Sequence, residues 1–295
     1  MTEQTVATLI QAVSAEFAQH PLSYGHGTDN AWDEAVSLVL YLTKLPDVEA
    51  SLALVLTQSQ VDVCLQATEQ RITTRQPLAY ILGRCRYMGL EFKLQAGVVV
   101  PRSPIGYLLH DGLEPWMPSE VNQVLDLCSG SGCLGILAAN VFPTAHVTLL
   151  ELDDQAIRVA EENVSLHKMN ERITLIQADV TNPGVFNQSF DLILSNPPYV
   201  DAPDMASLPA EYRAEPARGL AAGEDGLLVM DAILENLPKW LADGGLFVGE
   251  VGASAAALVR KYPRLPFIWP ELNQGGEGVF ALEAAALTSH TAATK

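Results

Sequence analysis

Residues 190–200, FDLILSNPPYV, carry an apolar, β-prone run directly into an asparagine, two prolines and a tyrosine. Pro197 and Pro198 fix their own φ angles and restrict the residue before each, so the end of this predicted strand is rigid. The side-chain oxygen of Asn196 and the carbonyl oxygen of Pro197 are two fixed acceptors that match the two N–H donors of a planar amine or amide. Tyr199 adds an aromatic wall for a planar group. The alternative, a Pro-Pro turn without chemistry, is common for this dipeptide in general.

A glycine-rich loop follows an earlier predicted strand in the stretch VLDLCSGSGCLG. Gly130, Gly132 and Gly135 form a G-x-G-x-x-G pattern, which alone fits a dinucleotide, an adenosyl cofactor or a tight turn. Glu151 closes the next predicted strand, where an acidic side chain can accept both ribose hydroxyls or can simply be solvated. We expect the cofactor to contact Cys128, Ser129, Gly130, Ser131, Gly132 and Glu151; for Cys128 and Ser129 the alternative is packing of small residues.

Asp126 distinguishes between these cofactor classes. It lies inside the predicted strand, where pyrophosphate-binding proteins normally carry apolar residues, and its carboxylate would repel a pyrophosphate. A carboxylate there suits a cationic ligand, and S-adenosylmethionine carries both a sulfonium and an amino group. Asp179 closes the third predicted strand and is expected to accept from the adenine amine; alternatively, it caps a turn at Thr181. The pattern predicts S-adenosylmethionine as cofactor and S-adenosylhomocysteine as product.

An amide nitrogen is a weak nucleophile because its lone pair is delocalised, and full loss of that conjugation costs about 18–20 kcal/mol. Orientation supplies roughly 7–11 kcal/mol of a barrier, so holding the substrate is not sufficient. Two acceptors that pull on both N–H groups raise the charge on nitrogen and stabilise the transition state. The predicted catalytic residues are therefore Asn196, Pro197, Pro198 and Tyr199, and Asn196 is also expected to contact the cofactor.

From about residue 120 onward, short apolar runs alternate with helical patterns. This alternation predicts an α/β fold with a mostly parallel sheet that is covered on both faces. Ligands of such sheets bind at the carboxyl ends of the strands, where the residues described above are expected. The predicted strands are 123–128, 146–152, 173–179, 190–196, 244–251 and 277–283, and the predicted helices are Cys133 to Val141, Asp153 to His167, Gly226 to Leu241 and Ser254 to Tyr262.

The first 75 residues place apolar side chains at helical spacing, which predicts three or more helices. Residues 86–101, RYMGLEFKLQAGVVVP, alternate and contain two glycines, which predicts a β-hairpin. We expect a helical domain at 1–84, a hairpin and linker at 85–118, a catalytic domain at 119–284 and a disordered tail at 285–295. The helical domain is expected to dock the substrate, and its alternative role is that of a packing cap. The apolar positions are Val6, Leu9, Ile10, Val13 and Phe17, then Trp32, Val36, Val39 and Leu40, then Val61, Leu65, Ala67 and Ile72.

The chain of 295 residues carries a net charge of −18, with a sequence pI of about 4.6. An acidic surface repels phosphate backbones and anionic lipid and attracts a basic partner, so neither stable nucleic-acid binding nor membrane association is expected. The N-terminus has no Lys or Arg before Lys44, and no apolar run approaches the length of a membrane span. The four cysteines lack the spacing of metal ligands, which predicts a reduced, cytoplasmic protein without a metal site.

The stretch from Asp126 to Tyr199 resembles the class I S-adenosylmethionine-dependent methyltransferases, in the NPPY subset that modifies glutamine amides or the exocyclic amines of bases. Segments 24–35, 98–106 and 201–227 are similar to the bacterial protein glutamine methyltransferases that act on the third large-subunit ribosomal protein. The resemblance covers nearly all the chain except the tail. It implies a Rossmann-like, seven-stranded, mostly parallel sheet with a small N-terminal helical domain and a connecting hairpin. It also implies S-adenosylmethionine as cofactor and a basic ribosomal protein of the large subunit as substrate.

The same resemblance assigns roles to individual residues. Asn196 and Pro197 would hold the target amide, and the cofactor would be surrounded by Asp126, Gly130, Gly132, Glu151 and Asp179. Relatives often carry Asp in place of Glu151, whose longer side chain still reaches a ribose. The basic residues near the site, Arg102, Arg213 and Arg218, either contact substrate or form local ion pairs with Glu211 or Glu215.

Three other functions remain open from the residues. The sister family that methylates the GGQ glutamine of peptide release factors typically has an acidic residue and a threonine after its IPRP segment, and lacks the long acidic stretch after NPPY. Here the sequence at 101–104 is PRSP, which favours the ribosomal-protein enzymes. An adenine-amine methyltransferase would need a basic groove, and this chain lacks clusters of Lys and Arg. A non-catalytic ribosome assembly factor on the same fold is the third alternative.

Overall fold

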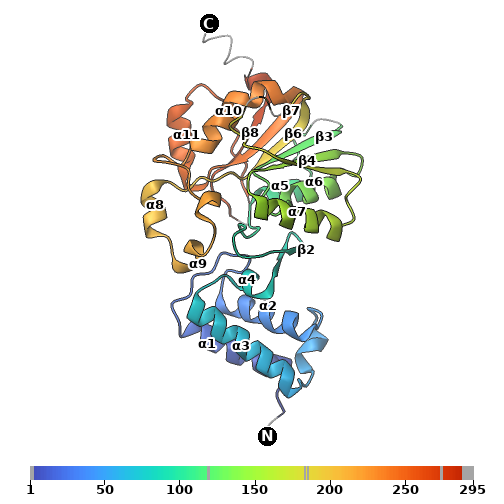
Figure 1. Cartoon of the computed structure of the whole chain (residues 1–295), viewed down its shortest axis with the longest axis vertical. Coiled ribbons are helices and arrows are strands. Elements are labelled where there is room, and N and C mark those ends of the chain that lie inside the picture. Colours follow the sequence, from blue (N-terminus) through green and yellow to red (C-terminus); the bar gives the residue numbers. More distant parts are fainter. Residues whose placement is uncertain (1–2, 118–119, 183, 185, 273–274, 288–295) are drawn as a thin grey trace.

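The computed structural model of the chain describes residues 3–117, 120–182, 184, 186–272 and 275–287 (Figure 1). The predicted boundary between 118 and 119, and most of the tail predicted at 285–295, lie outside these residues. Within the described ranges, no helix is long and apolar enough to cross a membrane. All four cysteines are free thiols, and Cys64 and Cys133 are buried.

Four helices form the N-terminal part of the molecule, at the foot of Figure 1: α1 (Val6–Ala18), α2 (Ala31–Thr43), α3 (Gln58–Thr74) and α4 (Leu78–Leu82). The side chains of Thr5, Asn30 and Thr57 cap the first three by accepting hydrogen bonds from backbone N–H groups of the first turn. Residues from Val6 to Leu82 form a core of their own, separate from those of the sheet. The predicted helices are confirmed, although Trp32 and Leu65 are each 48% exposed.

A hairpin leads out of this helical part, with strand β1 (Arg84–Tyr87) paired antiparallel to β2 (Leu90–Lys93). Its turn residues, Met88 and Gly89, have φ angles of 48° and 77°, as a tight two-residue hairpin turn requires. The predicted hairpin is therefore confirmed. After a short linker, the next helix is α5 (Ile105–His110).

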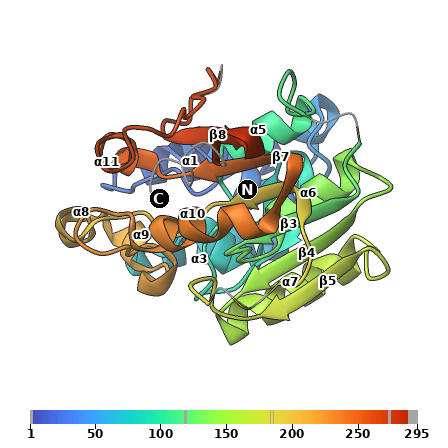
Figure 2. The same cartoon turned by 90° about the horizontal axis from the view of Figure 1, so that it is seen from above.

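Six strands form the large sheet in the order β5-β4-β3-β6-β7-β8, which Figure 2 shows from above. All neighbours are parallel except β7 and β8, so the predicted mostly parallel sheet is confirmed. The bounds are β3 (Gln123–Leu127), β4 (His146–Glu151), β5 (Ile173–Gln177), β6 (Phe190–Ser195), β7 (Leu241–Glu250) and β8 (Val279–Glu283).

Among the described residues the sheet has six strands, and the seventh that the resemblance implies is present only as a bridge. In the position of a seventh strand, Ile268 forms an isolated antiparallel bridge with Ala281 of β8. The surrounding sequence, YPRLPFIWP, contains Pro263, Pro266 and Pro270, each of which lacks the N–H that a continuing ladder needs. The edge strand is thus reduced to one bridge.

Successive side chains of the strands pack on opposite faces of the sheet. Val124, Leu192 and Val248 belong to one core, while Leu125 and Ile193 belong to the other. The first core includes α5, α6 (Cys133–Val141) and part of α7 (Asp154–Leu166), and the second includes α10 (Leu228–Trp240) and α11 (Ala255–Lys261). Both faces are covered, which confirms the predicted α/β layering, and each predicted helix lies within two residues of its observed bounds.

The segment after NPPY connects the two parts of the molecule. It contains α8 (Ala202–Ser207), α9 (Ala210–Arg213) and a short 3₁₀ helix (Ala217–Gly219). Glu211 of α9 is fully buried and binds two residues of the N-terminal part: Arg71 of α3 at 3.1 Å and Arg75 at 2.6 Å. A buried charge needs a hydrogen-bonded partner of opposite charge in good geometry. This contact therefore fixes the position of the helical part against the sheet.

Candidate active site

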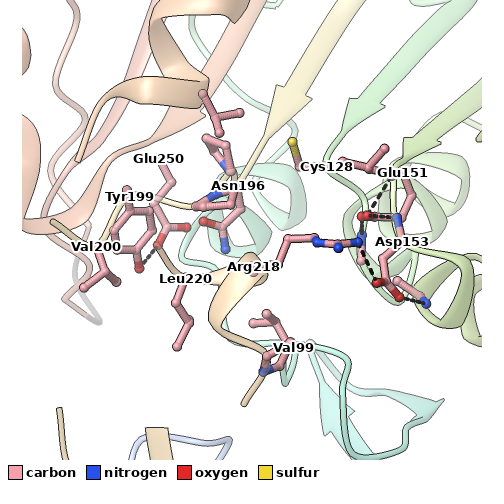
Figure 3. Close-up of a pocket in the computed structure, with 18 of the residues that line it drawn as sticks. Val99, Cys128, Glu151, Asp153, Asn196, Tyr199, Val200, Arg218, Leu220 and Glu250 are labelled. Atoms are coloured by element: carbon pink, nitrogen blue, oxygen red, sulfur yellow. Dashed lines mark hydrogen bonds and ion pairs between the residues drawn. The ribbon is translucent and has the colours of Figure 1, made fainter. Parts of the chain in front are cut away.

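The carboxyl ends of the parallel strands open into one cavity of about 500 Å³, a size that holds a small-molecule ligand. Figure 3 shows Glu151 and Asp153 on one side of this cavity and Asn196, Tyr199 and Glu250 on the other. Eight of the predicted site residues line it: Cys128, Gly130, Glu151, Asp179, Asn196, Pro197, Pro198 and Tyr199. Thus the predicted amide site and most of the predicted cofactor site meet in one place.

The glycine loop turns sharply between β3 and α6. Cys128, Gly130 and Gly132 have φ angles of 58°, 56° and 78°, so the backbone enters the left-handed region three times within five residues. The Gly132 N–H donates to the Ser129 carbonyl at 2.8 Å and closes the turn. A Cβ at Gly135 would lie 2.1 Å from Leu149 Cδ2, so a glycine is needed where α6 packs on β4. The motif therefore serves both a tight turn and close helix–strand packing.

Asp126 lies beneath this loop rather than in the cavity lining, and it is 1% exposed. Its Oδ2 accepts a hydrogen bond of 2.8 Å from the Gly135 N–H in the first turn of α6. Its Oδ1 is buried and has no hydrogen-bond partner among the described residues. Burial raises the pKa of Asp126 to about 7 although the Gly135 hydrogen bond lowers it. The carboxyl group is therefore held next to the loop with one acceptor oxygen unused.

Ser129, Ser131 and Gly132 are not among the residues that line the cavity. Ser129 is 7% exposed, and its N–H donates to the Leu150 carbonyl at 3.1 Å, which joins the loop to β4. The Ser131 carbonyl accepts from Asn163 Nδ2 at 3.0 Å, and the same Asn163 amide binds the backbone of Lys93 at the hairpin. These hydrogen bonds hold the loop against β4 and Asn163.

Two acidic residues of the cavity are held by the backbone. Glu151 Oε2 accepts from the Gly130 N–H at 2.8 Å, and its Oε1 accepts from the N–H groups of Leu152 and Asp153. The carboxylate thus has a fixed orientation at the end of β4, with acceptor capacity left on both oxygens. Asp179 Oδ1 accepts from the backbone and hydroxyl of Thr181, which is the turn cap that the sequence also allowed.

The NPPY turn follows β6 directly. Ser195, the last residue of the strand, is fully buried and donates to the Leu127 carbonyl at 3.0 Å, so the turn starts from a fixed point between β3 and β6. The turn ends at Val200, whose N–H donates to the Leu220 carbonyl at 2.8 Å. Both ends of the turn are therefore anchored, and its polar groups can be presented to the cavity with little freedom.

Sequence reasoning missed Glu250 and did not assign a role to Ser103. Glu250 ends β7, lines the cavity and is 4% exposed; its pKa is raised by burial, although hydrogen bonds from Ser103 and Tyr199 lower it. The available signal was an acidic residue at the carboxyl end of a predicted parallel strand, the same signal that identified Glu151.

Arg102 also lines the cavity, and its predicted local ion pair with Glu215 is confirmed. The guanidinium donates to Glu215 Oε1 at 2.7 Å and to Oε2 at 2.8 Å. Burial would raise the pKa of Glu215, but hydrogen bonds from His26 and Arg102 and the Arg102 charge lower it to about 2. Arg218 pairs instead with Asp153, at 3.3 Å, so the expected partner was wrong for this residue.

Comparison with known proteins identifies the family. Residues 110–238 match the model of the Methyltransferase small domain. A protein of Francisella tularensis named ribosomal protein uL3 glutamine methyltransferase is 37% identical over 99% of this chain and 94% of its own length. A Burkholderia pseudomallei protein of the same name is 40% identical over 96% of each chain. The chain belongs to the uL3 glutamine methyltransferase family.

The fold agrees with this family membership. The hMettl16 catalytic domain, solved in complex with an RNA hairpin, matches with a TM-score of 0.53 and 15% sequence identity, covering 83% of this chain and 91% of its own. At that identity the likeness concerns the fold alone, which is that of a methyltransferase. The predicted fold class and the prediction of a methyltransferase are confirmed.

Proposed function

We propose that this chain transfers a methyl group from S-adenosylmethionine to the side-chain amide nitrogen of a glutamine in ribosomal protein uL3. The observation that carries the proposal is that Asn196, Pro197 and Tyr199 line the same cavity as Gly130 and Glu151. A rigid pair of acceptors for a planar N–H₂ group therefore faces the residues expected at the cofactor. Both reactants can then meet in one cavity at the carboxyl edge of the sheet.

The residues present fit S-adenosylmethionine. Asp126 supplies a buried carboxylate with an unused oxygen, Gly130 and Cys128 bring backbone to the cavity, and Glu151 has acceptor capacity for ribose hydroxyls. Asp179 remains available to an adenine amine through acceptor capacity beyond its Thr181 cap. When bound, S-adenosylmethionine supplies an electrophilic methyl group on a positively charged sulfur.

The chain's contribution to the reaction is to hold and polarise the amide. The Asn196 side-chain oxygen and the Pro197 carbonyl accept its two N–H groups, while the Tyr199 ring covers one face. Losing amide conjugation costs about 18–20 kcal/mol, whereas orientation can lower a barrier by only roughly 7–11 kcal/mol. The acceptors must therefore also stabilise charge at nitrogen. The N–C bond forms as the S–C bond breaks, and one N–H proton then leaves to solvent.

The names of the two relatives favour uL3 over a release factor as substrate. A net charge of −18 is complementary to a basic ribosomal protein before RNA covers it. The helical part at 1–84 would dock that protein, and the substrate places the activity in the cytoplasm. Stable binding of nucleic acid is not part of the proposal.

The test is methylation of purified substrates with labelled S-adenosylmethionine. Wild-type protein should methylate uL3 and leave a release factor unlabelled, and mass spectrometry should locate one methyl group on a glutamine. Asn196→Ala should abolish labelling while cofactor binding, measured by calorimetry, is partly retained. Asn187→Ala, an exposed residue outside the cavity, is the matched control and should behave as wild type.

Two results would overturn the proposal. Labelling of the release factor in preference to uL3 would assign the chain to the sister activity. Ribosomal proteins from cells lacking the gene should miss one methyl group in mass spectrometry. If Asn196→Ala restores that methyl group in these cells, the chemistry does not depend on the NPPY turn.

A further inference from the structure

The Glu250 carboxylate joins three segments that are far apart in the sequence. Its Oε1 accepts the Tyr199 hydroxyl at 2.8 Å, and its Oε2 accepts the Ser103 hydroxyl at 2.5 Å. The Tyr87 hydroxyl of the hairpin in turn donates to the Ser103 carbonyl. A continuous line of hydrogen bonds therefore runs from the hairpin, through the linker and the end of β7, to the NPPY turn.

The Tyr199 ring is held at two places. A Cβ built on Gly252 would lie 2.6 Å from Tyr199 Cε2, so the ring rests directly on the backbone after β7. The hydroxyl end is fixed by Glu250, which Figure 3 shows pointing toward it beside the cavity. The backbone contact limits the position of the ring, and the hydrogen bond determines which way it faces.

We infer that Glu250 is a positioning residue, which holds the Tyr199 ring in the orientation that makes it a wall of the amide site. The inference rests on the proposed function, since it concerns the same site. Glu250 is 4% exposed, and each of its oxygens accepts from one hydroxyl, which are the partners a buried carboxyl group needs.

The isosteric variant Glu250→Gln separates two possible roles. If Glu250 acts by holding the Tyr199 ring, the variant should stay active; if its charge acts directly on the reaction, the variant should be slow. In Glu250→Gln the amide oxygen can still accept from Tyr199, and the NH₂ group can donate to the Ser103 hydroxyl oxygen. The charge is lost but the bridge is kept. In Glu250→Ala both links are lost, and in Tyr199→Phe only the link to the ring is lost while the aromatic wall remains.

The experiment measures kcat, the KM for uL3 and the Kd for S-adenosylmethionine in these variants. Glu250→Ala and Tyr199→Phe should each lower kcat roughly ten- to a hundredfold, because the ring is no longer held in one orientation and the amide is misplaced. The Kd for the cofactor should stay within about twofold of wild type, and Glu250→Gln should recover most of kcat. Adding Tyr199→Phe to Glu250→Ala should cause little further loss. Glu283→Gln, exposed on neighbouring β8, is the matched control and should resemble wild type.

Two outcomes would overturn the inference: a Glu250→Gln enzyme as slow as Glu250→Ala, or a Tyr199→Phe enzyme as fast as wild type. If Glu250→Ala fails to fold, the other two variants still decide the question. A wild-type enzyme that is inactive on uL3 would count against the proposed function. If wild type and Tyr199→Phe are equally active on uL3, the result counts only against the role of the Glu250–Tyr199 hydrogen bond.

Discussion

Replacing Asp126 by Asn removes a buried charge while it keeps the shape of the side chain and one acceptor oxygen for the Gly135 N–H. The carboxyl group is 1% exposed, has one hydrogen bond from Gly135, and has an Oδ1 with no partner in the described part of the chain. We expect the variant to gain stability relative to wild type as pH rises, and to bind S-adenosylmethionine more weakly.

The magnitude follows from the pKa of Asp126, which is 3.8 for the unperturbed group and about 7 in the folded protein. The folded state holds this proton more tightly than the unfolded state. The stabilising contribution is therefore complete below pH 3.8 and is lost as pH rises to about 7. At 1.36 kcal/mol per pKa unit the full loss is about 4 kcal/mol. Between about pH 5.5 and about pH 8.5 the loss is about 2 kcal/mol, and Asn does not titrate.

The assay is urea unfolding of the ligand-free proteins at these two pH values. The free energy of unfolding of Asp126→Asn, minus that of wild type, should be about 2 kcal/mol more positive at the higher pH. Any constant cost of burying the Asn NH₂ group cancels in this comparison. Asp243→Asn, at an exposed position of β7, is the control and should show no such change. A pH-independent difference for Asp126→Asn would refute the reasoning.

Cofactor affinity is the second measurement on the same variant. Loss of a charge-assisted contact costs roughly 1.5–3 kcal/mol, so calorimetry above pH 7 should give a Kd for S-adenosylmethionine about ten- to a hundredfold weaker than wild type. In wild type this affinity should rise with pH up to about 7, as the carboxyl group ionises, and then level off. An unchanged Kd in the variant would remove Asp126 from the proposed cofactor site.

The remaining predictions concern packing, the buried ion pairs and substrate attraction. Gly135→Ala should lower the free energy of unfolding by about 1–3 kcal/mol, because the new Cβ would lie 2.1 Å from Leu149 Cδ2; unchanged urea unfolding would contradict this. Glu211→Gln should lower it by about 1.5–3 kcal/mol, because Arg71 and Arg75 both lose a hydrogen-bonded carboxylate, although Arg71 keeps its 2.6 Å ion pair with Glu34. Burial raises the pKa of Glu211, but hydrogen bonds from Arg75, the Ser23 N–H and Arg71 lower it from 4.5 to about 2, so the wild-type advantage should disappear as pH falls through that interval. The rate of uL3 methylation at low substrate concentration should fall as salt shortens the Debye length from about 10 Å to about 3 Å; a flat response would exclude electrostatic steering.

Features that depend on short stretches of sequence were predictable. The glycine loop, the NPPY turn and the hairpin turn at Met88 and Gly89 each follow from local backbone preferences, which act within a few residues. The convergence of Gly130, Glu151 and Asn196 was also predictable, because the carboxyl ends of parallel strands share one edge of the sheet. For these residues, position in the strand pattern was enough.

Other features depend on packing between distant segments. The Glu250 link to Ser103 spans 147 residues and the Arg75 link to Glu211 spans 136, so no local pattern contains either. Helical spacing identified α2 and α3 and most of their buried positions, but Trp32 and Leu65 are each 48% exposed, because the extent of the buried face depends on the neighbouring helices. The seventh strand that the resemblance implies is reduced to a bridge, because the prolines around Ile268 lack the N–H groups that a longer ladder needs.

The charges around the cavity are arranged consistently with a reaction that moves positive charge from sulfur to nitrogen. Glu151 is oriented by backbone N–H groups and Glu250 by two hydroxyls, so both carboxylates are in place before the reaction and need no reorganisation. A cation in the same cavity would oppose the transfer, and Arg102 is such a cation. Its guanidinium is bound at both ends by Glu215, whose pKa of about 2 keeps that carboxylate ionised at neutral pH. Pairing with Glu215 therefore offsets the charge of Arg102 while its side chain still lines the cavity.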